Sequence, residues 1–154
     1  MRVVVQRVSK GGVYISSRNY SEEIGKGMVI LLGIKAGDKE DDVNYLADKC
    51  CNLRIFSKNN QLPENEKMNF SLKDIDGEVL LISQFTLYGD ARKGNRPGFT
   101  EAAKPEEAIP LYEKFIARVK QNLGDAKVKT GIFGEMMDVK IINEGPVTLI
   151  IESK

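Results

Sequence analysis

Apolar residues at the start of the chain follow the spacing of β-strands. Residues 3–8 are rich in valine, residues 9–12 have the composition of a turn, and residues 13–15 form a second, shorter strand pattern. Residues 28–34 include a continuous apolar run, which is typical of a strand covered on both faces. The pattern therefore predicts a strand-rich N-terminal region with one fully buried strand.

Two later stretches show the spacing of amphipathic helices. Asp38 opens the first, with Asp41 placed as in a capping box. The apolar stripe that follows consists of Val43, Leu46, Ala47, Cys50 and Leu53. Pro105 starts the second region, where Pro110 predicts a separate first turn before a main helix over residues 109–122.

The remaining pattern gives further strands and two long loops. Strands are expected over residues 78–87, 127–133, 138–143 and 147–152, and loops over residues 57–70 and 88–100. The 154 residues suit one domain, and we expect a single domain over residues 1–154. The fold class is α/β, with the two helices on one side of a curved sheet or of two packed sheets.

The amino-acid composition limits which binding functions and catalytic mechanisms are possible. Lys and Arg number 23 against 22 Asp and Glu, so the net charge of +1 excludes a protein that coats nucleic acid through bulk charge. Histidine is absent, which removes mechanisms based on a Ser-His pair, a Cys-His pair or a histidine-bound metal. No EF-hand spacing and no nucleotide-binding glycine motif occurs, so we expect no metal and no cofactor.

The cysteines and the hydropathy pattern indicate a location. Cys50 and Cys51 are adjacent, and we expect free thiols, with Cys50 in the core and Cys51 partly exposed. No apolar run approaches the roughly 20 residues that span a bilayer, and the N-terminus is too short and charged for a signal peptide. We expect a soluble, cytoplasmic protein with no membrane partner.

The first candidate site is Ser83-Gln84-Phe85-Thr86, where polar groups interrupt the end of an apolar strand. Strand alternation would place Ser83 and Phe85 on one face and Gln84 and Thr86 on the other. The segment leads into the second long loop, and loops at strand ends often hold ligands. The structural alternative is a strand that simply runs out into water.

The second candidate is Asn143-Glu144-Gly145-Pro146, between two predicted strands. Its structural interpretation is a four-residue hairpin loop, in which Gly145 supplies a positive φ and Pro146 prepares the next strand. Its functional interpretation requires Gly145 and Pro146 to aim their carbonyls at a ligand. Both interpretations are open at this point.

Two further loop segments are weaker candidates. Arg92, Lys93 and Arg96 lie on a glycine-bearing loop that could bind phosphates, and a solvated loop is the alternative. Lys67-Met68-Asn69-Phe70 ends the first long loop, and anchoring of its apolar residues in the core is the structural alternative.

Taken together, these segments resemble the D-aminoacyl-tRNA deacylase family along nearly the whole chain. Each motif is short, and their order and spacing make the resemblance specific. The motifs are Gln6-Arg7-Val8, Ile24-Gly25-x-Gly27, Leu31-Leu32-Gly33, Arg54-Ile55-Phe56, Lys67-Met68-Asn69, Ser83-Gln84-Phe85-Thr86-Leu87, Arg96-Pro97-x-Phe99, Thr130-Gly131-x-Phe133-Gly134 and Asn143-Glu144-Gly145-Pro146-Val147-Thr148. Glu144 stands where the family usually has Asp, and Gly11 or Gly12 stands where alanine is common. Neither departure removes a motif residue, so we expect activity to be retained.

The resemblance implies an enzyme that hydrolyses the ester between a D-amino acid and the terminal ribose of tRNA, and also glycine mischarged on tRNA-Ala. It implies a layered β/β/α fold, with two packed or barrel-like curved sheets and two main amphipathic helices. The partners would be tRNA, bound through Arg92, Lys93 and Arg96, and a second copy of the chain. In that homodimer, Gly145-Pro146 is expected to be cis and to enter the partner's pocket.

The absence of histidine agrees with this chemistry, because an aminoacyl ester is already activated. The expected catalytic residues are Ser83, Gln84, Phe85 and Thr86, with backbone N–H groups around Phe85 and Thr86 as oxyanion donors. The resemblance favours assistance by the ribose 2′-OH. Thr86 stays open as a nucleophile or as a group that positions water, although a lone threonine hydroxyl is a weak nucleophile.

Gly145 and Pro146, with Met68 and Asn69 nearby, are expected to select the substrate by its chirality. A rigid backbone suits this task, because rejection of an L side chain requires a wall that does not yield. Two alternatives stay open: a non-catalytic RNA-binding dimer, and a related deacylase that acts on mischarged L-aminoacyl-tRNA.

Overall fold

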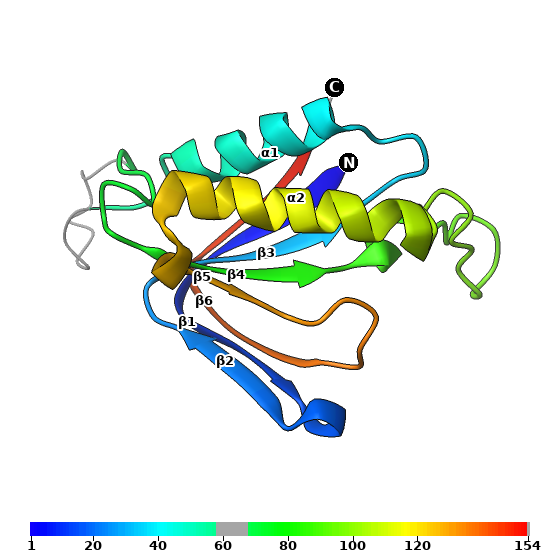
Figure 1. Ribbon diagram of the computed structural model, residues 1–154, viewed down its shortest axis with the longest axis horizontal. Helices are drawn as coiled ribbons and strands as arrows, with labels where there is room; N and C mark the ends of the chain where they lie inside the picture. The colour runs from blue at the N-terminus through cyan, green and yellow to red at the C-terminus, as the bar shows by residue number, and fades with distance from the viewer. Residues whose placement is uncertain (58–67, 154) are drawn as a thin grey trace.

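Two helices cover one face of a strongly curved sheet in the computed structural model, which describes residues 1–57 and 68–153 (Figure 1). The helices are α1 (Glu40–Asn52) and α2 (Pro105–Leu123), and they pack side by side. The strands are β1 (Arg2–Ile15), β2 (Tyr20–Ile24), β3 (Gly27–Gly33), β4 (Glu78–Ser83), β5 (Val128–Thr130) and β6 (Asp138–Glu152). Their order is β2-β1-β3-β4-β5, and β6 pairs with the other edge of β1.

Strand β1 organises the sheet because it pairs with three others. Its first half lies between β3 and β6, and its second half lies between β2 and β6. The predicted turn over residues 9–12 is wrong, since β1 runs through it with a register shift near Val8. Gly11 serves close packing instead, because a Cβ there would lie 3.0 Å from Val29 and 3.1 Å from Ile24.

The curvature of the sheet creates two hydrophobic cores. Met28, Ile30 and Leu32 of β3 point into the core beneath the helices, whereas Val29 points into a second core enclosed by the curled sheet. Strand β4 alternates in the same way. The prediction that residues 28–34 are buried on both faces is therefore confirmed, and so is the layered, barrel-like α/β fold in a single continuous sheet.

Helix α2 differs from its prediction at its start. It begins at Pro105 and continues through Pro110, so the separate first turn is wrong. Pro110 lies on the exposed side near the N-terminal end of the helix, where water can replace the hydrogen bond that proline removes.

In α1, Cys51 is buried rather than partly exposed as predicted, and burial raises the pKa of its thiol to about 11. Both thiols are free.

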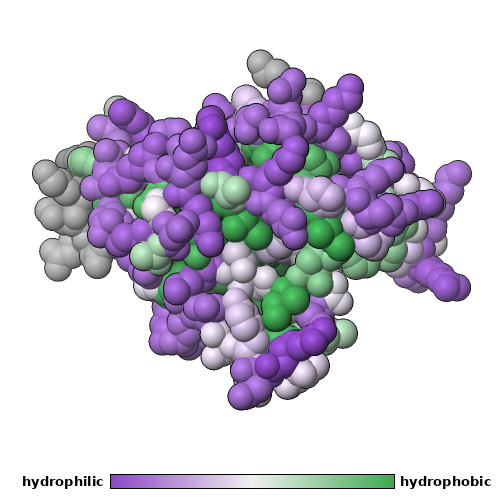
Figure 2. Space-filling view, viewed as in Figure 1, coloured by the Kyte–Doolittle hydropathy of each residue, from purple (hydrophilic) through white to green (hydrophobic). Residues whose placement is uncertain are grey.

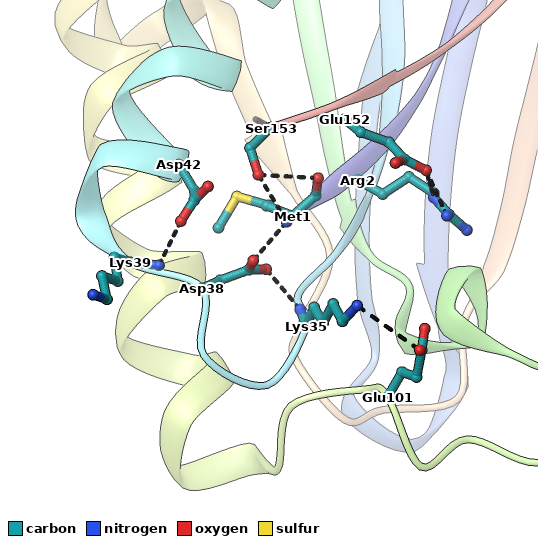
Figure 3. A network of polar contacts seen from close by, with 9 residues as sticks. All are labelled: Met1, Arg2, Lys35, Asp38, Lys39, Asp42, Glu101, Glu152 and Ser153. Carbon is teal, nitrogen blue, oxygen red and sulfur yellow. Dashed lines mark hydrogen bonds and ion pairs between the residues drawn. The ribbon is translucent and has the colours of Figure 1, made fainter.

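The start of α1 is tied to both ends of the chain (Figure 3). The helix is capped by Lys39 and Asp42, one residue later than predicted, and the Lys39 N–H donates to Asp42 Oδ2 at 2.7 Å. Asp38 instead accepts a hydrogen bond from the amino group of Met1 at 2.6 Å, and that group also donates to Ser153 Oγ at 2.9 Å.

No helix among the described residues is long and apolar enough to cross a membrane.

Candidate active site

The end of β4 turns sharply into a short 3-10 helix, η2 (Phe85–Tyr88). The prediction of a strand through residue 87 is wrong, and the expected alternation of faces over residues 83–86 does not hold. The Gln84 N–H donates to Leu32 O at 2.8 Å, which fixes where the chain bends. The next N–H groups, of Phe85 and Thr86, begin η2, and the first donors of a helix have no acceptor within it. These two amides are therefore available to a ligand oxygen.

A cavity of about 410 Å³ lies beside this bend. Its floor is apolar, and Ser83, Gln84 and Phe85 form one side. Residues 133–137, which lie in the segment that joins β5 to β6, also line the cavity and are called the pocket wall below. Figure 2 shows hydrophobic side chains at the surface between α2 and the segment that joins β5 to β6. The pocket thus combines an apolar interior with polar groups on one rim, as small-molecule sites usually do.

Thr86 is exposed and is not among the residues that line the cavity, and its hydroxyl oxygen already accepts a hydrogen bond. Gln84 Nε2 donates to Thr86 Oγ1 at 2.5 Å. Among residues 1–57 and 68–153, no carboxylate or amine forms a hydrogen bond with Thr86 that could remove its proton. The geometry therefore gives Thr86 no general base, which a threonine nucleophile would need.

Gly145 and Pro146 lie in a wide bulge of β6 and not in a hairpin loop. Residues 138–152 form one strand that pairs along β1, so the predicted hairpin is wrong. Asn143 faces Val8 and Thr148 faces Gln6, which leaves residues 144–147 opposite Arg7 alone. We call these four residues the Gly-Pro bulge. Its Gly145-Pro146 peptide bond is cis, and Gly145 has a φ of 123°, which favours glycine.

Arg7 holds the bulge from inside the molecule. Its side chain is buried, with Nε donating to Glu144 O at 3.1 Å and Nη1 donating to Ile55 O at 2.6 Å. A Cβ on Gly145 would lie 2.9 Å from Arg7 Nη2. Sequence reasoning did not assign a role to Arg7, although a charged residue within a run of valines was a signal that it is paired in the core.

Met68 and Asn69 lie on the same side of the molecule as the bulge. The Asn69 N–H donates to Phe56 O at 3.0 Å, and Asn69 Oδ1 accepts from Arg54 Nη1 at 3.1 Å. Arg7 contacts Ile55 between those two partners. Met68 is exposed, whereas Lys67 of the same motif lies outside the described residues. The expected selection residues therefore gather around residues 54–56.

The pocket and the bulge are at opposite ends of the strands. Ser83 is aligned with Leu32 and Val3, whereas Arg7 is aligned with Met28. Four residues separate these levels on β1, or about 13 Å along the strand direction. The structure thus brings Ser83, Gln84, Phe85 and Thr86 together, and it brings the bulge near Asn69, but it does not join the two groups.

The loop that carries Arg92, Lys93 and Arg96, called the basic loop below, follows η2. Arg92 binds both carboxylate oxygens of Asp90, at 2.9 and 2.8 Å, and this holds the pKa of Asp90 below its usual range. Lys93 and Arg96 are exposed. Phe99 packs at the end of the loop against Phe85, with ring centroids 5.2 Å apart.

No group of three His, Cys, Asp or Glu residues in the described parts of the chain could hold a metal ion.

The sequence is similar to one family of known proteins. The sequence model of a family described as D-Tyr-tRNA(Tyr) deacylase matches residues 4–152. The chain is 51% identical to a D-aminoacyl-tRNA deacylase of Flavobacterium psychrophilum, over 100% of this chain and 98% of that one. It is 53% identical to a D-aminoacyl-tRNA deacylase of Halalkalibacterium halodurans, over 100% of both chains.

Two solved structures share the fold. One, titled c-Myc DNA Unwinding Element Binding Protein, has a TM-score of 0.89 and 34% identity, covering 100% of this chain and 99% of that one. The other, titled as a probable eukaryotic D-amino acid tRNA deacylase, has a TM-score of 0.85 over 99% and 98% of the two chains. Its identity of 17% makes this second likeness one of fold alone.

Proposed function

Because the chain belongs to the D-aminoacyl-tRNA deacylase family, we propose that it hydrolyses the ester bond between a D-amino acid and the 3′-terminal ribose of tRNA. The products are the free amino acid and tRNA. The observation that carries this proposal is the pocket beside Ser83, whose rim presents the amides of Phe85 and Thr86. We also propose a cytoplasmic location, which a tRNA substrate supports.

Catalysis requires little from side chains in this mechanism. Water attacks the ester carbonyl, and the amides of Phe85 and Thr86 stabilise the oxyanion that forms. The bond to the ribose 3′-oxygen then breaks, and that oxygen takes up the proton that the attacking water gives up. We assign the transfer of this proton to the neighbouring ribose 2′-OH, a role supported by the lack of a base paired with Thr86 in the described residues.

Chiral selection is assigned to the Gly-Pro bulge of a second copy of the chain. The bulge projects its exposed Gly145 and Pro146 at the end of the strands away from the chain's own pocket. In a homodimer, their carbonyls would receive the α-ammonium group of the substrate, and the proline ring would occupy the space of an L side chain. Glycine has no side chain to reject, so glycine mischarged on tRNA-Ala is also a substrate.

Exposed apolar side chains support the homodimer. Phe85 is 56% exposed at the pocket mouth, Met136 is 90% exposed on the pocket wall, and Ile150 is 69% exposed on β6. A second copy that covers such groups removes apolar surface from water. Size measurement at micromolar concentration should give about twice the chain mass of 17.2 kDa, and a fully active monomer would contradict the assignment.

The deciding experiment measures deacylation by the purified protein in the presence of a metal chelator. D-tyrosyl-tRNA and glycyl-tRNA-Ala should be hydrolysed, and L-tyrosyl-tRNA should remain intact. The comparison variant is Ala108→Trp, which places an indole in the pocket from the buried face of α2 and should abolish hydrolysis, with circular dichroism to check that the variant is folded. Binding of tRNA without hydrolysis would identify a non-catalytic RNA-binding protein, and hydrolysis of the L-substrate would identify the other deacylase.

A further inference from the structure

The two end strands of the sheet, β2 and β5, are joined by side chains. No backbone ladder pairs them among the described strands. Tyr20 at the start of β2 donates from its hydroxyl to Thr130 O of β5 at 2.8 Å. Lys129 of β5 forms an ion pair with Glu22 of β2 at 3.4 Å. The curled sheet is therefore closed at this seam by polar side chains.

The tip of the β1–β2 hairpin extends this seam to the pocket wall. The tip is a short 3-10 helix, η1 (Ser16–Arg18). Arg18 Nε donates to Glu135 Oε1 at 2.8 Å, and Arg18 Nη2 lies 2.6 Å from the same oxygen. Ser17 Oγ donates to Glu135 Oε2 at 3.1 Å. Both oxygens of Glu135 are thus engaged by η1, and these contacts hold the pKa of Glu135 below its usual range.

Near Glu135, the backbone of the pocket wall makes one turn hydrogen bond, from the Glu135 N–H to Ile132 O at 3.3 Å. Phe133 packs against Tyr112, with ring centroids 5.8 Å apart, and Met137 packs against the second core. Between these anchors, Gly134 is exposed with a φ of 79°, and Met136 is 90% exposed. Besides that turn bond, the centre of the wall is held through the side chain of Glu135, by Ser17 and Arg18 of the hairpin tip.

We propose that Ser17 and Arg18 are positioning residues, which fix the pocket wall through Glu135 and so set the shape of the substrate pocket. The hairpin tip is distant in sequence from the wall and takes no part in the chemistry. Arg18 is 61% exposed, and exposed ion pairs contribute little to the free energy of folding. The predicted consequence of losing the contact is a looser wall in a protein that remains folded.

The test compares Arg18→Ala with a matched control on the same hairpin. Lys10→Ala removes the exposed ion pair between Lys10 and Glu23, which are 3.2 Å apart and do not line the pocket. Hydrogen exchange of the amides of residues 133–137 should become faster in Arg18→Ala and remain unchanged in Lys10→Ala. The melting temperature should stay close to that of the wild type in both variants.

A kinetic measurement, which rests on the proposed deacylase function, reports the effect on the substrate. Arg18→Ala should raise KM for D-tyrosyl-tRNA about fivefold to tenfold and change kcat less than about twofold. Arg18→Lys, which keeps the charge but not the forked geometry, should restore part of the loss.

The exchange and kinetic results separate the two proposals. Unchanged exchange of residues 133–137 in Arg18→Ala would overturn the positioning role, whatever the activity. An equal rise of KM in Lys10→Ala would also overturn it. A wild-type protein without activity would instead refute the deacylase function, and faster exchange in Arg18→Ala would still support the role of Arg18 in shaping the pocket.

Discussion

The pocket beside Ser83 and the Gly-Pro bulge both form where a strand leaves its regular pairing, but their shapes are opposite. The first is a cavity of about 410 Å³ whose interior is apolar. The second projects an exposed Gly145 and Pro146 outward on a base held by the buried Arg7. If the bulge acts on a pocket, as we propose, it must be the pocket of a second copy, because the two features of one chain are separated by about 13 Å along the strands.

Arg7→Met tests how the bulge is held and should have the largest effect. The substitution removes the donors to Glu144 O and Ile55 O while filling similar space. Because a buried charged donor is lost, the free energy of unfolding should fall by about 3 kcal/mol, and discrimination against L-substrates should weaken. Urea denaturation and paired D- and L-tyrosyl-tRNA assays check this. Lys10→Met, on the exposed side of the same strand, is the control and should change little.

Gly145→Ala sharpens the comparison by changing the tip of the bulge itself. The new Cβ would lie 2.9 Å from Arg7 Nη2 and 3.0 Å from Val147 Cγ2, at a φ of 123°. Gly124→Ala is matched, because Gly124 has a φ of 94° and open space around it. Backbone strain alone should lower the free energy of unfolding of Gly124→Ala by about 1 kcal/mol. Strain together with the close contacts should lower that of Gly145→Ala by about 2 kcal/mol.

Only the Gly145 variant should lose chiral discrimination, as measured by the ratio of D- to L-tyrosyl-tRNA hydrolysis. Equal ratios in the two glycine variants would show that the bulge does not select the substrate.

The basic loop beside the pocket gives a smaller, salt-dependent effect. Replacing Lys93 and Arg96 with Ala should weaken tRNA binding and reduce the slope of log affinity against log salt by about two. Arg92→Ala should change the slope less, because Asp90 already binds the Arg92 guanidinium. Binding titrations at several salt concentrations measure this. An unchanged slope in the double variant would mean that the loop does not contact phosphates.

Thr86→Ala should have the smallest effect on the chemical step. The hydroxyl accepts a hydrogen bond from Gln84, and the backbone amides of η2 remain in the variant. Single-turnover rates should fall less than about tenfold, whereas loss of a true nucleophile costs far more. A complete loss of the chemical step in a folded, tRNA-binding variant would identify Thr86 as the nucleophile. A substrate that ends in 2′-deoxyadenosine should react slowly if the ribose 2′-OH assists.

Much of the fold could be predicted from local sequence patterns, and the wrong predictions also have local causes. The buried strand β3 and the helix α1 were predicted because their hydrophobic periods are strong. Strand β2 was missed because its sequence is short, polar and lies at a sheet edge. The glycines at 11 and 12 have the composition of a turn, but the packing of Gly11 against Ile24 and Val29 became visible only in the folded sheet.

The candidate site could be predicted only as far as its residues are adjacent in the sequence, as are Ser83, Gln84 and Phe85, which line the cavity. The contact of Arg7 with Glu144 depends on the pairing of β1 with β6, and neither segment alone determines the register of that pairing. The contact of Arg18 with Glu135 depends on how far the sheet curls. Long-range register and curvature are properties of the whole fold, so these partners could not be derived from local spacing.

The most direct test of a site shared between two copies is subunit mixing of two defective variants. Gly145→Ala keeps its pocket but has an altered bulge, and Ala108→Trp keeps its bulge but has a filled pocket. The two are unfolded together, refolded as a mixture, and assayed with D- and L-tyrosyl-tRNA. If the bulge acts in the partner's pocket, the mixture should show a higher ratio of D- to L-hydrolysis than Gly145→Ala alone. A ratio equal to that of Gly145→Ala alone would contradict a site built from two chains.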